Sequence, residues 1–208
     1  MYMYKYIIFD IDGTILDTEL AVLTSLQRLL REELDKEFSF EELSFSFGIP
    51  GEVTLNKLGI KNVSEAFNKW FGYSRDYFHH VKVFDDIRET LEELKSSGVS
   101  MGIVTSKTRG EFDNGFIPFG IGEYFKYVIC ADDTEKHKPN PEPILKFIEL
   151  SGASKEECIY IGDTKYDSEC AFSAGIDFAL ALWGAKSSKG IGAKYVLKRP
   201  TEILELNF

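Results

Sequence analysis

Two aspartates at the end of the first apolar segment are the residues whose types and spacing suggest chemistry. Residues Tyr6 to Phe9 are apolar without interruption, Asp10 and Asp12 follow them, and Gly13 comes next. Such a run is typical of a strand that is buried on both faces, and the glycine lets the backbone turn out of the sheet. Acids at the carboxyl end of a strand lie where open α/β sheets bind ligands. The alternative is that Asp12 and Gly13 form an ordinary turn, with Asp10 as a solvated neighbour.

Three later segments repeat this arrangement of a predicted strand followed by polar side chains. The strands are expected at 100–105, 127–130 and 158–161, and the polar residues at or after their ends are Thr105, Ser106, Lys138, Asp163 and Asp167. Because parallel strands end at the same edge of a sheet, we expect these groups to meet there. Carboxylates clustered without histidine or cysteine suit Mg²⁺, while the hydroxyls and the lysine would hold phosphate oxygens. Each group also has a structural interpretation as a strand end, a loop residue or a helix cap.

The hydrophobic pattern predicts the elements that position these residues. After Thr14 a long amphipathic helix is indicated by leucines at helical spacing, namely Leu20, Leu23, Leu26, Leu30 and Leu34. Shorter helical pieces continue to His80, and none of them has the pattern of a parallel strand. From Val81 onward helices and strands alternate, which is typical of a parallel sheet with helices on its faces. The first helix of this part is expected to begin with a capping box formed by Asp86 and Glu89.

The predicted fold class is therefore α/β, with a doubly wound parallel-sheet core and an inserted all-helical unit. Residues 1–14 and 81–208 make up the core, and residues 15–80 make up the insert, which is smaller than a typical domain. A chain of 208 residues is long enough for one sizeable core with such an accessory unit.

Composition argues against several classes of function. The formal net charge of −10 at pH 7 disfavours binding to nucleic acid or to an anionic membrane. No segment approaches the roughly twenty apolar residues of a membrane span, and the N-terminus has no signal-peptide pattern, so we expect a cytoplasmic protein. Cys130, Cys158 and Cys170 have neither zinc-site nor disulfide spacing, and we expect buried thiols.

These residues together resemble the haloacid dehalogenase superfamily, in the branch of phosphatases with a helical cap after the first motif. The resemblance covers essentially the whole chain and implies a Rossmann-like core. In chain order, the four segments that resemble the family's motifs are Asp10-Ile11-Asp12-Gly13-Thr14, Val104-Thr105-Ser106, Lys138-Pro139, and Gly162-Asp163-Thr164 with Asp167. Their order and spacing all agree, which is far more specific than any single motif.

The resemblance implies a role for each motif residue. Asp10 would be the nucleophile that forms an aspartyl-phosphate, Asp12 the general acid and base, and Thr105 or Ser106 would hold the phosphate together with Lys138. Magnesium would be bound by the Asp10 side chain, the Asp12 backbone carbonyl and Asp163, while Asp167 would support the metal or Lys138. A cation is a physical requirement here, because a carboxylate can attack a charged phosphate only when their charges are screened.

The implied function is that of a magnesium-dependent phosphatase, a phosphoric monoester hydrolase acting on a small phosphorylated metabolite. The resemblance is to phosphoglycolate phosphatases and related pyrophosphatases, so the substrate would be phosphoglycolate-like, a sugar phosphate or pyrophosphate. Specificity is expected in the cap, chiefly in the loop Phe47, Gly48, Ile49 and Pro50, where the sequence offers no cluster of arginines or lysines. The cap is expected to close over the site, and we expect a monomer or a weak dimer.

Two alternatives remain open at this point. A β-phosphoglucomutase-like phosphotransferase would share every core residue, but such mutases carry a histidine in the first cap helix. The matching stretch, Thr18 to Leu23, has none, and Val22 stands at that spacing. The other alternative is a non-enzymatic receiver-type domain, which accepts phosphate without turning substrate over. The large helical insert argues against it.

Overall fold

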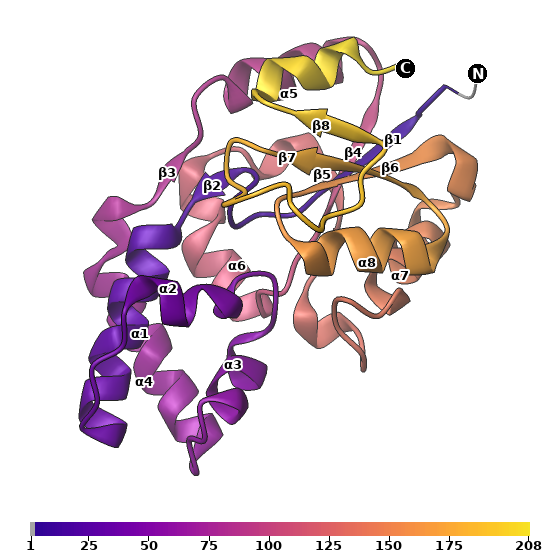
Figure 1. Cartoon of the computed structure of the whole chain (residues 1–208). Coiled ribbons are helices and arrows are strands. Elements are labelled where there is room, and N and C mark those ends of the chain that lie inside the picture. The colour runs from indigo at the N-terminus through magenta and orange to yellow at the C-terminus, as the bar shows by residue number, and fades with distance from the viewer. Residues whose placement is uncertain (1–2) are drawn as a thin grey trace.

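The computed structural model describes residues 3–208, and a six-stranded parallel sheet forms its centre (Figure 1). The strands lie in the order β5-β4-β1-β6-β7-β8. Their bounds are Tyr6–Phe9 for β1, Ser100–Val104 for β4, Phe125–Ile129 for β5, Cys158–Gly162 for β6, Asp177–Ala181 for β7 and Tyr195–Leu197 for β8. β1 is central, and it pairs in parallel with β4 and β6. The predicted α/β fold with a parallel sheet is confirmed.

Different helices cover the two faces of the sheet, because successive strand residues point to opposite sides. On one face, Ile7 and Phe9 of β1 share a core with residues of α5 (Ile87–Ser96) and α6 (Arg109–Gly115). On the other face, Ile8 packs in a core with α7 (Glu142–Ser151) and α8 (Lys165–Ala174). All three side chains are fully buried. This double burial explains why the segment before Asp10 is apolar at every position.

A separate group of helices lies beside the sheet and has its own apolar core (Figure 1). It consists of α1 (Glu19–Leu34), α2 (Phe40–Leu43), α3 (Gly51–Lys57), α4 (Val63–Asp76) and the 3-10 helices Ser44–Ser46 and Phe78–His80. The chain enters this group through β2 (Leu16–Asp17) and leaves it through β3 (Lys82–Val83). These two strands pair antiparallel, so the two connections lie side by side.

The start of α5 differs from the prediction. Asp86 precedes the helix with a backbone φ of 66°, and its side chain makes no capping hydrogen bond, so the predicted capping box with Glu89 is wrong. The reason is a turn, in which the Ile87 amide donates to the Phe84 carbonyl at 3.3 Å and places Asp86 in the left-handed region. Capping boxes do form at α6 through Thr108 and at α8 through Thr164.

The three cysteines are free and buried, as predicted. Within residues 3–208, none of the helices combines the length and apolarity that crossing a membrane would require.

Candidate active site

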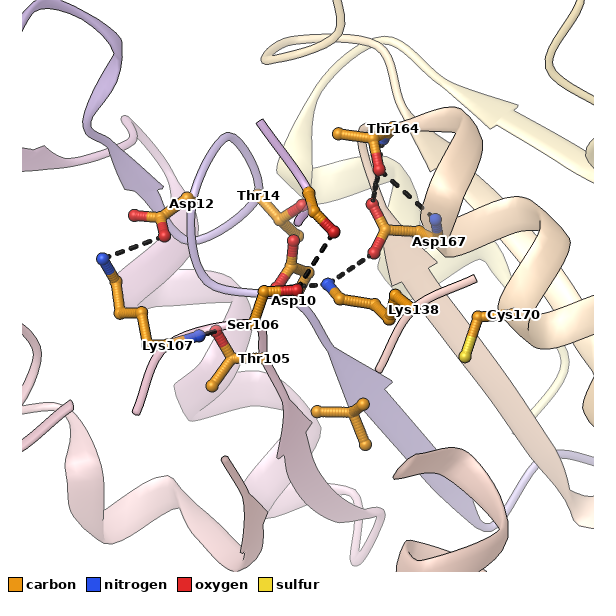
Figure 2. A network of polar contacts seen from close by, with 12 residues as sticks. Asp10, Asp12, Thr14, Thr105, Ser106, Lys107, Lys138, Thr164, Asp167 and Cys170 are labelled. Atoms are coloured by element: carbon orange, nitrogen blue, oxygen red, sulfur yellow. Dashed lines mark hydrogen bonds and ion pairs between the residues drawn. The ribbon is translucent and has the colours of Figure 1, made fainter. Parts of the chain in front are cut away.

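The carboxyl ends of β1, β4 and β6, with the loop after β5, bring the predicted residues to one edge of the sheet (Figure 2). Asp10 directly follows β1, and its amide donates to the Ile161 carbonyl of β6 at 2.9 Å. This bond continues the parallel ladder by one residue and fixes Asp10 at the sheet edge. The residue is only 3% exposed. Burial therefore dominates the electrostatics of its carboxylate.

Lys138 lies at the centre of the polar contacts. Its Nζ is 3.0 Å from Oδ1 of Asp10 and donates to Oδ1 of Asp167 at 2.7 Å and to the hydroxyl of Tyr160 at 3.1 Å. Burial alone would lower the pKa of Lys138, but the two carboxylates raise it above its ordinary value. A charged lysine in this position partly neutralises the buried acids and presents its ammonium group beside Asp10.

Asp167 has its two carboxylate oxygens occupied by different partners. Oδ1 accepts from Lys138 and, at 3.0 Å, from the Tyr160 hydroxyl, while Oδ2 accepts from the Thr164 amide at 3.0 Å and the Thr164 hydroxyl at 2.5 Å. The bonds to Thr164 are the capping box of α8, so the start of this helix also orients the carboxylate. Asp167 is fully buried and holds Lys138 in place.

The three carboxylates of Asp10, Asp163 and Asp167 each offer an oxygen within 4.8 Å of the others. Burial, together with the charges of Asp167 and Asp10, raises the pKa of Asp163 well above its usual range. Burial also raises the pKa of Asp10 to about 7, with Asp167 and Asp12 adding to the effect and Lys138 opposing it. A divalent cation would relieve this repulsion. The donors are all oxygens, which is the ligand type that Mg²⁺ requires.

Gly13 makes room for Asp163 in this cluster. Its φ is 74°, and a Cβ atom there would lie 2.2 Å from Oδ2 of Asp163. The next residue, Thr14, donates from its hydroxyl to Oδ1 of Asp163 at 3.3 Å. Only glycine fits this close approach between the loop after β1 and the loop after β6.

Asp12 points away from the carboxylate cluster and toward Lys107 (Figure 2). Its Oδ2 lies 2.9 Å from the Lys107 Nζ, while its buried Oδ1 has no hydrogen-bond partner among the described residues. Burial tends to lower the pKa of Lys107, but Asp12, Glu111 and Asp10 raise it. The ion pair thus fixes one oxygen of Asp12, and the other oxygen is left without a partner in the described part of the chain.

Thr105 and Ser106 use their hydroxyls differently. The Thr105 oxygen accepts from the Lys107 amide at 3.2 Å, which leaves its proton free to be donated. The Ser106 hydroxyl instead donates to the Gly48 carbonyl at 3.0 Å and so links the core to the helical group. Of the two predicted phosphate-binding hydroxyls, Thr105 is the one that retains a donor.

A cavity of about 130 Å³ lies between the sheet edge and the helical group. Asp10 and Asp12 line it on one side, and Phe47, Gly48 and Ile49 of the predicted specificity loop line it on the other. Pro50 precedes α3, where its carbonyl accepts from the Thr54 amide at 3.0 Å.

Two residues of this network were missed by the sequence analysis. Tyr160 lies within the apolar strand β6, and nothing in the pattern showed that its hydroxyl would reach Lys138 and the Val104 carbonyl. Lys107 directly follows Thr105 and Ser106, and this adjacency was a signal that could have identified it.

Proteins with similar sequences and folds are known. Residues 7–181 match a family described as haloacid dehalogenase-like hydrolase. "Putative pyrophosphatase PpaX" of Caldanaerobacter subterraneus subsp. tengcongensis is 34% identical over 179 residues, covering 85% of this chain and 81% of that protein. "Pyrophosphatase PpaX" of Bacillus cereus (strain AH820) is 29% identical, covering 96% and 94%. The crystal structure of a "putative phosphoglycolate phosphatase" from Lactobacillus plantarum has a TM-score of 0.90 at 28% identity, covering 98% of this chain and 99% of that one.

Proposed function

This chain belongs to the haloacid dehalogenase-like hydrolase family, and we propose that it is a magnesium-dependent phosphatase that hydrolyses a small phosphorylated metabolite through an aspartyl-phosphate on Asp10. The observation that carries the proposal is the placement of Asp10. Its carboxylate is buried at the sheet edge, 3.0 Å from the Lys138 ammonium, and within a cluster of acids that a cation would stabilise.

In the first step, a carboxylate oxygen of Asp10 attacks phosphorus, and the bond from phosphorus to the leaving oxygen breaks. Asp12 donates a proton to that oxygen. In the second step, Asp12 takes a proton from water while the water oxygen bonds to phosphorus. The bond between phosphorus and Asp10 then breaks, which releases phosphate and restores the enzyme. Asp12 is suited to both steps because it lines the cavity that would hold the leaving group, and its Oδ1 has no hydrogen-bond partner among the described residues.

Lys138 and Thr105 would bind the phosphoryl oxygens, the first by its charge and the second by its free hydroxyl proton. Asp10, Asp163 and the Asp12 backbone carbonyl would hold Mg²⁺, whose positive charge, when the ion is bound, reduces the repulsion between Asp10 and the phosphate. Asp167 would support phosphate binding indirectly, by keeping Lys138 in place. Its own carboxylate oxygens already accept hydrogen bonds from Lys138, Tyr160 and Thr164.

The same proposal assigns substrate access to residues 15–80, as a cap that moves on the paired strands β2 and β3. Ser106 and Gly48 hold the cap against the core in the arrangement described above. Closure would exclude water other than the one that reacts, and opening would release the product.

The test is phosphate release from a panel of phosphate esters, with Mg²⁺ and with a chelator, for the wild type and Asp10→Asn. We expect turnover only with metal, and none for Asp10→Asn, because an amide is neither an anionic nucleophile nor a good cation ligand. A thermal melt serves as control for folding of the variant. Near-wild-type activity of Asp10→Asn, or activity unchanged by chelation, would contradict the mechanism.

A separate measurement distinguishes hydrolysis from the mutase alternative. Val22 lines the cavity at the position where the resemblance predicts a histidine in a mutase, and this favours water as the acceptor. Wild-type protein would be incubated with β-glucose 1-phosphate and a trace of the bisphosphate. Formation of glucose 6-phosphate without matching phosphate release would overturn the hydrolase assignment.

A further inference from the structure

The cavity beside Asp12 is the place where the leaving group of the substrate must lie. Asp12, the proposed proton donor, lines this cavity together with the nucleophile Asp10. A second hollow is lined by Gly13 and by Asp163, one of the proposed metal ligands. Because the leaving oxygen must meet its proton donor, the character of the first cavity indicates which leaving groups fit. This argument rests on the proposed function.

The charges around this cavity are unfavourable for an anionic leaving group. Its lining includes the carboxylates of Asp10, Asp12 and Glu111, and Lys107 is the only cationic residue among the lining residues within 3–208. Lys107 is already paired with Asp12 at 2.9 Å. The Glu111 carboxylate accepts from the amide and the hydroxyl of Thr108, at 2.8 Å each, in the capping box of α6, and neither bond comes from a cation. A carboxylate or a second phosphate would thus enter without an unpaired cation to meet it.

The walls supplied by the cap are largely apolar and aromatic. Ile49, Phe67, Trp70, Phe71 and Phe78 all line the cavity. Its volume of about 130 Å³ is close to that of cavities of roughly 150 Å³ that hold a benzene ring in other proteins. A flat or branched apolar group of this size would bury its surface against these side chains.

Two residues that line the cavity, Ser46 and Thr18, have buried hydroxyls without a hydrogen-bond partner within residues 3–208. Ser46 and Thr18 are 6% and 4% exposed, and neither side-chain oxygen makes a hydrogen bond among the described residues. The nearby Ser25 differs, because its hydroxyl accepts from Trp70 and donates to the Val22 carbonyl. A buried hydroxyl without a partner costs about 1–3 kcal/mol, so a ligand that supplies a hydrogen-bonding group would be favoured at Ser46 and Thr18.

We propose that the substrate is a phosphate monoester whose leaving group is uncharged, with an apolar body of about one ring and a neutral hydrogen-bonding group that meets Ser46 or Thr18. Esters with an anionic leaving group, such as phosphoglycolate, and pyrophosphate itself are poorer substrates of this site. The hydroxyls of a sugar would supply hydrogen bonds to Ser46 or Thr18, but a sugar would bury less apolar surface against the aromatic side chains than a ring such as benzyl.

The first test compares esters that differ in one group. Benzyl phosphate, 4-hydroxymethylbenzyl phosphate and 4-carboxybenzyl phosphate share the reacting bond and the ring, and phosphoglycolate and pyrophosphate complete the panel. We expect the carboxylate to lower kcat/KM about tenfold or more relative to benzyl phosphate, because its charge is uncompensated, and the hydroxyl to raise kcat/KM. Equal or faster hydrolysis of the carboxybenzyl ester, of phosphoglycolate or of pyrophosphate would overturn the inference and leave the phosphatase assignment standing. Release of phosphate from none of the compounds would overturn the phosphatase assignment, and the inference with it.

The second test changes the cavity. Ser74 lines it from α4, and Ser74→Lys supplies the missing cation. We expect the ratio of kcat/KM for the carboxybenzyl ester over benzyl phosphate to rise about tenfold. The exposed Ser97, which precedes β4 at the opposite edge of the sheet, gives the control Ser97→Lys, with the same added charge and an unchanged ratio. Ser46→Ala combined with Thr18→Val should remove the advantage of the hydroxymethyl ester. An unchanged ratio in Ser74→Lys, with the variant folded by thermal melt, would contradict the charge argument.

Discussion

Lys138 is the cation on which the charge balance of the active site depends. It contacts Asp10 and Asp167 with 1% of its side chain exposed, and Asp163 is buried nearby. Replacement by methionine, which has a similar length but no charge, should cost the metal-free protein about 3 kcal/mol of unfolding free energy, because buried carboxylates lose their partner.

Chemical denaturation of Lys138→Met with and without Mg²⁺ checks this prediction. The metal should restore part of the stability. Activity should stay very low, because the substrate phosphate loses the ammonium group that would bind it. Lys146→Met on the exposed side of α7 is the matched control, since its ion pair with Glu149 is solvated. Equal stability of Lys138→Met and Lys146→Met would contradict the assigned role.

Metal binding should depend on pH because the ligands hold protons. Burial raises the pKa of Asp10 to about 7 and that of Asp163 well above its usual range. In the metal-free protein these carboxyls are therefore protonated at lower pH, and stability falls as pH rises from the unfolded-state value of about 4 toward about 7. Mg²⁺ binds the ionised form, so its affinity should rise over the same range.

Calorimetric titration with Mg²⁺, in buffers of different ionisation enthalpy below and above about pH 7, measures the protons released on binding. We expect release at the lower pH and little at the higher pH, together with weaker affinity at the lower pH. Asp163→Asn is the control and should bind more weakly and release fewer protons. Affinity and proton count that do not change with pH would contradict a cluster of protonated carboxyls.

At the scale of residues, the motif positions could be predicted because each combines a reactive type with the end of a strand. Tyr160 could not be, because its hydroxyl acquires a role only through the fold, which places Lys138, Asp167 and the Val104 carbonyl around it. The assignment of Thr105 rather than Ser106 to the phosphate also depends on a long-range contact, the bond from Ser106 to Gly48.

Among the elements, the loop before α3 is held in place by a glycine. Gly48 has a φ of 80°, and a Cβ atom there would lie 2.6 Å from the Thr164 hydroxyl oxygen. Gly48→Ala should push the loop off the core, which would break the bond to Ser106 and lower kcat/KM. Gly59→Ala is a matched control, because its φ of 78° imposes the same backbone strain of about 1–2 kcal/mol but its Cβ would have no atom within 4 Å.

Steady-state kinetics and thermal melts of the two variants separate the effect of backbone strain, which both share, from the clash with Thr164, which only Gly48→Ala would make. We expect similar losses of stability in both and a loss of kcat/KM only in Gly48→Ala. The loss should be larger for esters that fill the cavity than for a small generic ester, because Phe47 and Ile49 move with the loop. Equal kinetics in both variants would show that the contact with Thr164 has no bearing on catalysis.

Most helices and strands were predictable, because the spacing of apolar residues and the length of an apolar run are local properties of the sequence. The uninterrupted apolar run gave β1, and the leucine spacing gave α1. The capping box at Asp86 failed because residue types alone do not reveal a left-handed φ, which the turn from Phe84 to Ile87 imposes. The pairing of β2 with β3 was missed because strands of two residues carry no periodicity.

In the whole molecule, several contacts join the cap to the core, and a hydrogen bond and an ion pair are among them. Ser106 binds Gly48, and Lys186 of the core pairs with Glu19 at the start of α1 at 2.7 Å. Both members of the second pair are about half exposed, and they line the same hollow as Asp163. A covalent link between these two positions would hold the cap closed.

Glu19→Cys with Lys186→Cys, joined by a short cleavable thiol cross-linker, tests whether the cap must open for turnover. The linked protein should lose multiple-turnover activity and regain it when the linker is cleaved. The native thiols should not interfere, because they are buried and burial raises the pKa of Cys130, Cys158 and Cys170 to about 12. Full activity of the linked protein would show that substrate and product pass without cap movement.

The pairing of β2 with β3 has a consequence for the evolution of substrate specificity. Leu16 faces Val83 and Asp17 faces Lys82, so the chain leaves the core for the cap and returns to it at points that are neighbours in space. β2 and β3 thus form a short hairpin, and the cap helices together make up the connection between its two strands. A loop can be lengthened, shortened or exchanged between genes without changing the order of the sheet or the position of Asp10. Recombination at this hairpin can therefore give the same reaction a new substrate in a single event.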